Sequence, residues 1–259
     1  MANTPGAALP PKIAIVTGGS RGLGRSTVVN LARRGVSSIF TYNSNRAEAE
    51  KVEKLAADAG AKGTALQLDT GKTATFDGFV ERVIATLQKL NAERFDYLVN
   101  NAGISHHAPI EKTSEVDLDN LYNVHFKGVF FLTQKLLPLI NDGGRIVNIS
   151  SGLTRFAIEG TAPYASMKGA VEVLTRCLAK ELGKRGIAVN TVAPGAIATD
   201  FSGGIVRDNP AAAKRASDMT ALGRPGVPED IGPMIASLLS EDNRWINGQR
   251  IEVSGGMML

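Results

Sequence analysis

The chain has 259 residues, of which 43% are hydrophobic and 21% charged, and its formal net charge is +4. This composition excludes a disordered chain, and the length is enough to bury a core without disulfides. No apolar run reaches the ~20 residues that span a bilayer, and we expect no secretory signal at the start. The single cysteine, Cys177, excludes an internal disulfide and favours a reducing compartment, so we expect a cytoplasmic protein.

The basic excess is confined to one end of the chain. The first 47 residues contain six basic side chains and no Asp or Glu, whereas the remainder carries 23 basic and 25 acidic side chains. A pI of about 9.2 raises the possibility of a nucleic-acid partner, but no tight Lys/Arg run accompanies it. The distribution instead predicts a local anionic ligand and no nucleic-acid partner.

Short apolar, β-rich runs alternate with helical stretches along the whole chain. Strands are expected at 13–16, 38–42, 64–68, 97–100, 145–149, 187–192 and 250–253, and helices at about 22–34, 46–59, 76–90, 118–140, 163–184 and 228–240. This alternation is typical of a parallel sheet that is covered on both faces. We therefore predict an α/β fold with a single, doubly wound parallel sheet of about seven strands and helices on both faces.

Two segments lie outside this alternation. Residues 1–11 contain three prolines and are expected to form a flexible tail before a single domain over 12–259. Residues 200–226 are long and rich in Gly, Ala and Pro, with at most a short helix near 210–218. A long connection inside a compact domain is often a binding lid, so we predict a substrate lid here.

A glycine-rich segment follows the first expected strand and opens the first helix. Its spacing is G-x-x-x-G-x-G, and glycines allow the backbone to approach a pyrophosphate closely. A helix N-terminus attracts phosphate through its free N–H groups and positive dipole end. A plain glycine turn is the alternative, but the position after the strand favours a dinucleotide site formed by Thr17, Gly18, Ser20, Arg21, Gly22, Leu23 and Gly24.

The segment that would contact the adenosine ribose contains no acidic residue. An enzyme that selects NAD would carry an Asp or Glu about 20 residues after the glycines, whereas this chain has Asn43, Ser44, Asn45 and Arg46. Together with Arg21 in the glycine loop, these residues could bind a 2′-phosphate, so we predict NADP(H) as the cofactor. Arg46 as a solvated charge at a helix start is the alternative.

Three polar residues form a candidate reaction centre. Tyr164 and Lys168 are four residues apart, which puts them on one face of a helix. A phenol has a pKa near 10, and a neighbouring ammonium group lowers that pKa toward the range useful for acid–base catalysis. Ser151 comes just after an expected strand, where α/β sheets meet their ligands, and could hold a carbonyl oxygen for protonation by Tyr164.

These motifs, in this order, resemble the short-chain dehydrogenase/reductases. The resemblance covers residues 12–259 and rests on Thr17–Gly24, Asn100-Asn101-Ala102-Gly103, Ser151 thirteen residues before Tyr164, Lys168, and Pro194-Gly195. It implies a Rossmann-like domain in which Tyr164 is the acid/base, Ser151 orients the carbonyl, and Lys168 binds the nicotinamide ribose. The further cofactor contacts that it implies are Asp69, Thr70, Asn101, Ala102, Gly103, Pro194, Gly195, Ile197 and Thr199.

The ending Ile246-Asn-Gly-Gln and Val253-Ser-Gly-Gly256 is similar to the NADP-preferring, 3-oxoacyl-acyl-carrier-protein reductase-like branch. The resemblance implies a ketone or aldehyde reductase that transfers a hydride between NADP(H) and a small carbonyl substrate, whose identity stays open. It also implies a homodimer or homotetramer built through the central helices. His106 and His107 are adjacent, which is poor spacing for metal ligands, so no metal is expected.

One position departs from the family pattern. Relatives commonly carry a catalytic Asn in the motif N-x-x-G-x-F-F-x-T-Q, where this chain has His125. Asn123 is not an easy substitute, because two residues along a helix turn a side chain by about 200°. His125 could preserve the proton relay, since in relatives the Asn acts largely through its backbone carbonyl and a bound water. Reduced activity, or a cofactor-binding regulatory protein with weak or no turnover, are the alternatives.

Overall fold

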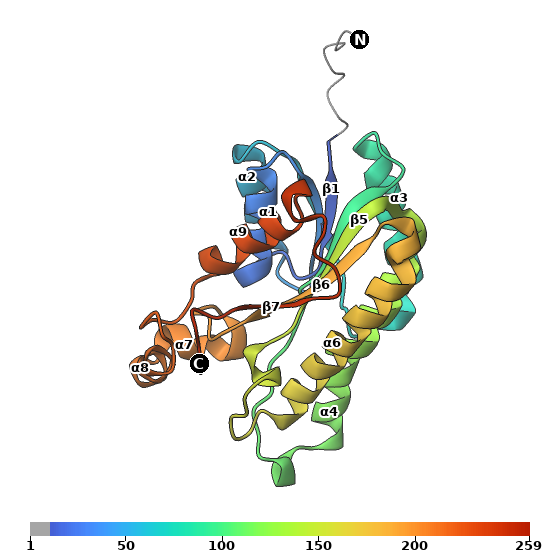
Figure 1. Ribbon diagram of the computed structural model, residues 1–259. Coiled ribbons are helices and arrows are strands. Elements are labelled where there is room, and N and C mark those ends of the chain that lie inside the picture. Colours follow the sequence, from blue (N-terminus) through green and yellow to red (C-terminus); the bar gives the residue numbers. More distant parts are fainter. Residues whose placement is uncertain (1–10) are drawn as a thin grey trace.

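The computed structural model describes residues 11–259 and contains one parallel sheet of seven strands, in the order β3-β2-β1-β4-β5-β6-β7. The strands are β1 (Ile13–Val16), β2 (Ser37–Tyr42), β3 (Gly63–Gln67), β4 (Phe95–Asn100), β5 (Ile140–Ile149), β6 (Ala188–Pro194) and β7 (Arg250–Val253). All seven expected strands are present, and the doubly wound parallel sheet is confirmed (Figure 1).

Helices cover both faces of the sheet, as Figure 1 shows. On one face lie α1 (Gly22–Ala32), α2 (Arg46–Asp58) and α9 (Pro228–Leu238), and on the other α3 (Phe76–Lys89), α4 (Glu115–Tyr122), α5 (Gly128–Leu136) and α6 (Ala162–Leu182). The strand β1 contributes Ala14 and Val16 to the first hydrophobic core and Ile13 and Ile15 to the second. Successive side chains of a strand point to opposite faces, so burial on both faces explains the continuous apolar run.

The expected helix over 118–140 is interrupted. Between α4 and α5 the residues Asn123–Lys127 form a π-helical turn, and the strand β5 already begins at Ile140. Gly128 follows the π-turn, and a Cβ atom there would lie 2.1 Å from the carbonyl oxygen of Thr70. The π-turn therefore carries His125 to a point where the helix approaches the loop after β3 very closely, and such turns are frequent at functional sites.

The segment expected to be a lid connects β6 to α9. It contains a 3-10 turn at Phe201–Gly204, the short helix α7 (Ile205–Asp208) and the helix α8 (Pro210–Asp218), which confirms the expected helix near 210–218. Its two ends lie side by side, because the amide of Ala198 donates to the carbonyl of Gly226 at 2.9 Å and Ile197 is bridged to Gly226. The expected tail over 1–11 lies almost wholly outside the described residues.

Within residues 11–259 we find no helix that is both long and apolar enough to span a bilayer.

Gly24 gives a test of the packing between the start of α1 and the glycine loop. A Cβ atom at Gly24 would lie 2.2 Å from the carbonyl oxygen of Gly18. We expect Gly24→Ala to lower the free energy of unfolding by at least about 1 kcal/mol, because the backbone must shift. The matched control is Gly78→Ala in α3, where a Cβ atom meets nothing within 4 Å; this change should be neutral or stabilise by up to about 1 kcal/mol. Urea denaturation of both variants measures the difference, and equal stabilities would contradict the steric argument.

Candidate active site

The candidate site lies at the carboxyl ends of the strands, where the chain direction across the sheet reverses. The strand β1 pairs with β2 on one side and with β4 on the other. The glycine loop follows β1, residues 101–103 follow β4, Ser151 follows β5 and the lid follows β6. In open α/β sheets ligands bind at this kind of reversal, so the structure brings most of the predicted site residues to one edge.

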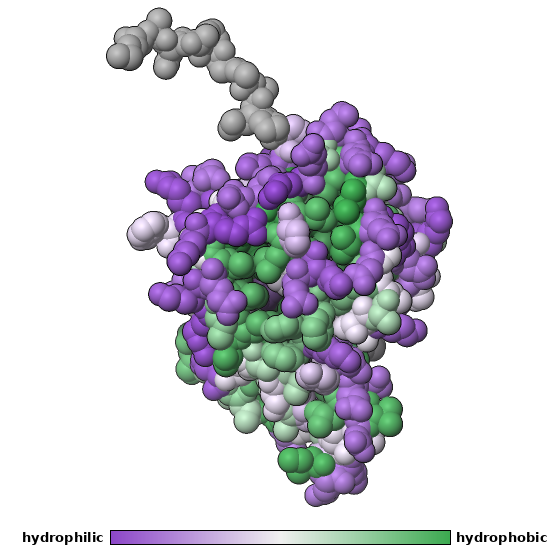
Figure 2. Space-filling model, turned by 90° about the vertical axis from the view of Figure 1, so that its right-hand side faces the viewer, coloured by the Kyte–Doolittle hydropathy of each residue, from purple (hydrophilic) through white to green (hydrophobic). Residues whose placement is uncertain are grey.

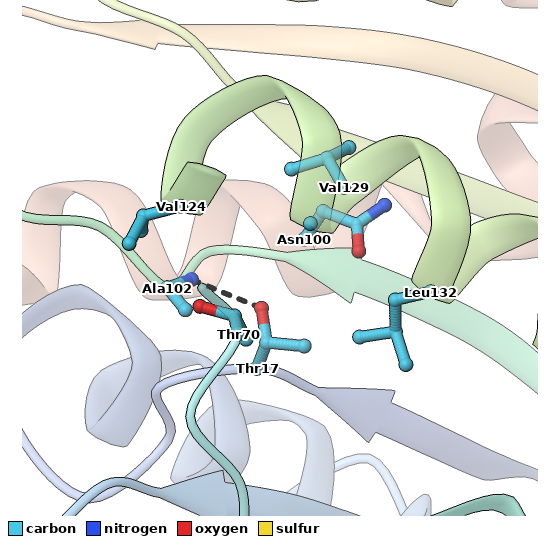
Figure 3. A pocket seen from close by; sticks show the side chains of 8 residues that line it. Thr17, Thr70, Asn100, Ala102, Val124, Val129 and Leu132 are labelled. Atoms are coloured by element: carbon cyan, nitrogen blue, oxygen red, sulfur yellow. Dashed lines mark hydrogen bonds between the residues drawn. The ribbon is translucent and has the colours of Figure 1, made fainter. Parts of the chain in front are cut away.

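The glycine loop is joined to the loop after β4 by hydrogen bonds. The hydroxyl of Thr17 accepts from the amides of Asn101 and Ala102, both at 2.9 Å, and Figure 3 shows the second of these bonds. The side-chain amide of Asn101 donates to the carbonyls of Thr17 at 2.8 Å and Gly18 at 3.1 Å. The Asn101 side chain therefore fixes the shape of the loop.

The start of α1 has the features of an anion site. No side chain caps its N-terminus, and its first turn contains no acidic residue. Gly18 and Gly22 have φ values of +65° and +52°, in the left-handed region that favours glycine. The N–H groups of this first turn are therefore free to meet a ligand.

Some of the residues expected near a 2′-phosphate already have hydrogen-bond or ion-pair partners within the protein. The Asn45 side chain caps α2 by accepting from the amide of Glu48, and Arg46 pairs with Glu50 at 2.8 Å. The carbonyl of Asn43 accepts from Gln67. The guanidinium of Arg21 makes no hydrogen bond or ion pair with any described residue, which makes it the more available cation.

Asp69, Thr70 and the residues after β6 also lie around this edge. Asp69 accepts from the amide of Gly71 at 3.0 Å and lies 3.5 Å from Lys72 Nζ. Thr70 and Thr17 line one narrow gap beneath the π-turn (Figure 3). A Cβ atom at Gly22 would lie 3.6 Å from the methyl group of Thr199. The start of the lid therefore lies next to the glycine loop.

The three residues of the candidate reaction centre lie together. Lys168 is buried on α6, donates to the carbonyl of Ile149 at 2.7 Å, and lies 5.6 Å from the centre of the Tyr164 ring. The hydroxyl of Ser151 lies beside the phenol of Tyr164, close enough to influence its pKa. From the lid, the ring of Phe201 lies 6.0 Å from that of Tyr164. A carbonyl compound bound here would meet a hydroxyl, a phenol and the lid.

Burial sets the charge states of this centre. Burial raises the pKa of Tyr164 above its usual range, and the neighbouring Ser151 hydroxyl acts in the opposite direction. Burial lowers the pKa of Lys168 to about 7. The centre therefore holds a neutral phenol, which is a proton donor, beside an amine whose pKa lies near neutral pH.

His125 is buried against the loop after β4. Its Nε2 lies 2.7 Å from the carbonyl oxygen of Ile104 and 3.2 Å from that residue's amide nitrogen, and we assign the proton to Nε2 because the carbonyl contact is shorter. Its Nδ1 is buried without a hydrogen-bond partner among the described residues. The ring meets that of Tyr164 edge-on at 5.2 Å. No pattern in the sequence could have predicted the contact with Ile104.

The pKa of His125 lies well below its ordinary value. Burial is the largest cause, and the positive charge of Lys168 acts in the same direction. The imidazole is therefore neutral at physiological pH and resists taking up a second proton.

The comparisons with known proteins agree with this geometry. Residues 18–258 match the model of a protein family described as enoyl-(acyl carrier protein) reductase. An oxidoreductase of Methylorubrum extorquens is 37% identical over 251 residues, which cover 96% of this chain and 98% of that protein. A hydroxynaphthalene reductase-like protein of Metarhizium majus is 34% identical, and the match covers 96% of this chain and 95% of that protein.

Solved structures match over nearly the whole chain. The promiscuous reductase LugOII, which catalyses keto-reduction at C1 during lugdunomycin biosynthesis, has a TM-score of 0.92 and 35% identity, covering 98% of this chain and 100% of that one. The angucycline C-6 ketoreductase LanV with bound NADP has a TM-score of 0.91 and 33% identity, covering 96% of each chain. The protein is an oxidoreductase with a Rossmann-like fold. It belongs to the short-chain dehydrogenase/reductase family.

The low pKa of His125 predicts a pH-dependent stability. Below about pH 6.5 this histidine is protonated in the unfolded chain, whereas the buried ring of the folded protein stays neutral. The free energy of unfolding therefore falls by up to about 1.4 kcal/mol for each further unit by which the pH is lowered. Above pH 7 this contribution is fully present. We expect His125→Asn to remove this loss, so that the wild type loses more stability between pH 7.5 and 5.0 than the variant. Denaturation curves at both pH values measure it, with His107→Asn at an exposed position as control; parallel curves would contradict the assignment.

Proposed function

We propose that the protein is an NADP(H)-dependent oxidoreductase that transfers a hydride between nicotinamide and a carbonyl or hydroxyl carbon, with Tyr164 as the acid/base. The observation that carries this proposal is the convergence of Ser151, Tyr164 and Lys168 at the sheet edge that also holds the glycine loop. The NADP bound to LanV and the keto-reductions of the two structural neighbours support the choice of cofactor and reaction.

The residues around the glycine loop fit such a dinucleotide. The uncapped start of α1 would hold the pyrophosphate, and the unengaged guanidinium of Arg21 would meet the 2′-phosphate. Arg46 is a weaker candidate because it is paired with Glu50. Bound NADPH would supply the hydride. The remaining contacts that we propose are Ser20, Leu23, Asn43, Ser44, Asn45, Asp69, Thr70, Ala102, Gly103, Pro194, Gly195, Ile197 and Thr199.

In the proposed reaction the side chains of Ser151 and Tyr164 act only on the carbonyl oxygen of the substrate. Ser151 holds that oxygen by donating a hydrogen bond, and Tyr164 donates its phenolic proton to it as the carbonyl carbon is reduced. A protonated Lys168 beside the ring lowers the cost of the phenolate that is left. An anionic cofactor nearby would favour this protonated form and raise the pKa of Lys168 above about 7.

His125 is the reason to keep a second function, a cofactor-binding regulatory protein with weak or no turnover. Its Nε2 is engaged by the carbonyl of Ile104, so only Nδ1 remains for a proton relay. We propose that turnover is retained, because Ser151, Tyr164 and Lys168 lie together and none of them is hydrogen-bonded to the imidazole. Unchanged kcat and pH profile in His125→Asn would exclude a special role of the imidazole.

The substrate class that we propose is a ketone or aldehyde of small-molecule size, with no nucleic acid or membrane partner. Apolar side chains next to the reaction centre support a partly apolar substrate, since Phe201 lies against Tyr164 and Phe156 lies close to Gly152. The cytoplasm is our proposed location, because Cys177 is an exposed free thiol, which fits a reducing compartment.

An assay of NADPH oxidation over a panel of ketones, aldehydes and acyl thioesters tests the function. We expect turnover of at least one ketone or aldehyde, and a loss of at least about 100-fold in kcat for Tyr164→Phe, because the proton donor is removed. NADPH should bind Tyr164→Phe as tightly as the wild type in a fluorescence titration. Tight NADPH binding with no turnover across the panel would instead favour the regulatory protein.

The same assay with NADH tests the choice of cofactor. We expect kcat/KM to be at least about tenfold higher with NADPH, and Arg21→Ala to narrow this ratio by weakening binding of NADPH alone. The matched control is Arg33→Ala at the end of α1, which should leave the ratio unchanged. A tenfold preference for NADH would contradict the proposed 2′-phosphate site.

We also propose that the protein is a homodimer or homotetramer. Large apolar side chains are exposed on α4 and α5, including Val116, Tyr122, Phe130 and Phe131, each at least 39% exposed. Figure 2 looks onto the side of the molecule that carries the central helices and shows hydrophobic side chains gathered among hydrophilic ones. Contiguous apolar patches of this kind are typical of protein interfaces, and pairing through α4 and α5 would cover this one.

Light scattering tests the assembly. We expect a mass of two or four chains for the wild type and a smaller assembly for Phe130→Asp, because a carboxylate would be buried in the interface. The control is Leu55→Asp on α2, an exposed leucine on the opposite face of the sheet. A monomeric wild type would refute the proposal.

A further inference from the structure

An ion pair lies behind the loop that carries Ser151. Glu172 on α6 and Arg250 on β7 are 78 residues apart in the sequence, yet Arg250 Nε donates to Glu172 Oε1 at 2.8 Å. Their side chains are 13% and 24% exposed, so water covers little of either. A largely desolvated, charge-assisted hydrogen bond of this kind has a defined geometry, unlike most surface ion pairs.

The carboxylate of Glu172 holds the Ser151 loop on both sides. Its Oε1 accepts from the hydroxyl of Ser150 at 2.7 Å and from the hydroxyl of Thr154, also at 2.7 Å. Ser150 and Thr154 flank the segment that contains Ser151. With Arg250, three donors therefore converge on one carboxylate oxygen, which only an ionised acid accommodates well.

Arg250 holds the same loop through its backbone. Its Nη2 donates to the carbonyl of Ser151 itself at 3.2 Å, and its Nη1 lies 3.1 Å from the carboxylate of Glu252. Because β7 is hydrogen-bonded to β6 in the sheet, the backbone that carries Arg250 is held in place. The loop is thus tied to the sheet edge by Arg250 and to α6 by Glu172.

The connection to α6 matters because this helix also carries the other two residues of the candidate centre. Glu172 lies one helical turn after Lys168 and two turns after Tyr164. The ion pair therefore links the segment that bears the Ser151 hydroxyl to the helix that bears the Tyr164 phenol. Catalysis that depends on both groups holding one oxygen requires their separation to be kept within about 0.5 Å.

We propose that Glu172 and Arg250 are positioning residues that fix Ser151 relative to Tyr164 during carbonyl reduction. This inference rests on the proposed function. Neither residue reaches the reacting atoms, so both act through Ser151, and their effect on the reaction should vanish when the Ser151 hydroxyl is absent.

A double-mutant cycle between Glu172 and Ser151 tests this inference. Glu172→Gln has the same shape but cannot accept three donors on one oxygen. We expect kcat to fall roughly tenfold with unchanged NADPH affinity, because the catalytic geometry is loosened while the cofactor site is not. In the Ser151→Ala background, Glu172→Gln should lower kcat by less than about twofold. Arg250→Lys cannot hydrogen-bond to both Glu172 and the carbonyl of Ser151. It should therefore also lower kcat, and lower it less when Ser151 is replaced by alanine.

The control is Glu181→Gln, an exposed carboxylate farther along α6, which should leave kcat unchanged. An equal loss of kcat in both backgrounds would mean that Glu172 only stabilises the fold, and an unchanged kcat would mean that it contributes nothing. Either result overturns the inference while leaving the proposed function intact.

Amide hydrogen exchange separates the inference from the proposed function. If the wild type reduces no carbonyl compound, the proposed function fails, and exchange then decides the positioning role. We expect Glu172→Gln to speed exchange in a peptide covering 150–155 and to leave a peptide covering 100–103 unchanged. Exchange that is unchanged at 150–155, or raised equally in both peptides, would overturn the inference.

Discussion

The hydrogen bonds between Thr17 and Asn101 join the loops after β1 and β4, and most of the candidate site is arranged around this junction. The hydroxyl of Thr17 accepts hydrogen bonds from two backbone amides, and the side-chain amide of Asn101 donates to two backbone carbonyls. These four bonds fix the path of the glycine loop. The start of α1 then lies so close to Gly18 and Asn101 that residue 24 has no room for a side chain. The lid, through Thr199, approaches the same loop. The junction thus fixes the start of α1 next to the loop after β4.

Burial acts differently on the three titratable groups behind this junction. It favours the neutral forms of Tyr164, Lys168 and His125 alike. Only Lys168 is brought close to a charge change at neutral pH, so the charge of the centre can respond to an anionic ligand. His125 stays neutral, and its engaged Nε2 makes it a support for the loop at Ile104 as well as a neighbour of the Tyr164 ring.

The strand pattern and the motif order were enough to predict the fold and to bring the site residues to one edge, because both depend on local periodicity and spacing. The π-turn at His125 could not be predicted, since the surrounding apolar residues fit an ordinary helix. The early start of β5 at Ile140 was missed because Gly143 and Gly144 interrupt the apolar run. Arg46 is different: its pairing with Glu50, four residues on, was readable from the sequence and weakens it as a phosphate ligand.

No feature of the sequence predicts the contact between Glu172 and Arg250. The two residues are 78 positions apart, and only the folded sheet brings them together. The lid provides a different case, in which a long segment connects two points of the domain that lie next to each other. Its ends are hydrogen-bonded to each other at Ala198 and Gly226, so the segment leaves and re-enters the domain at one place. Changes of sequence between those ends therefore act where Phe201 lies against Tyr164, on the side of the proposed substrate.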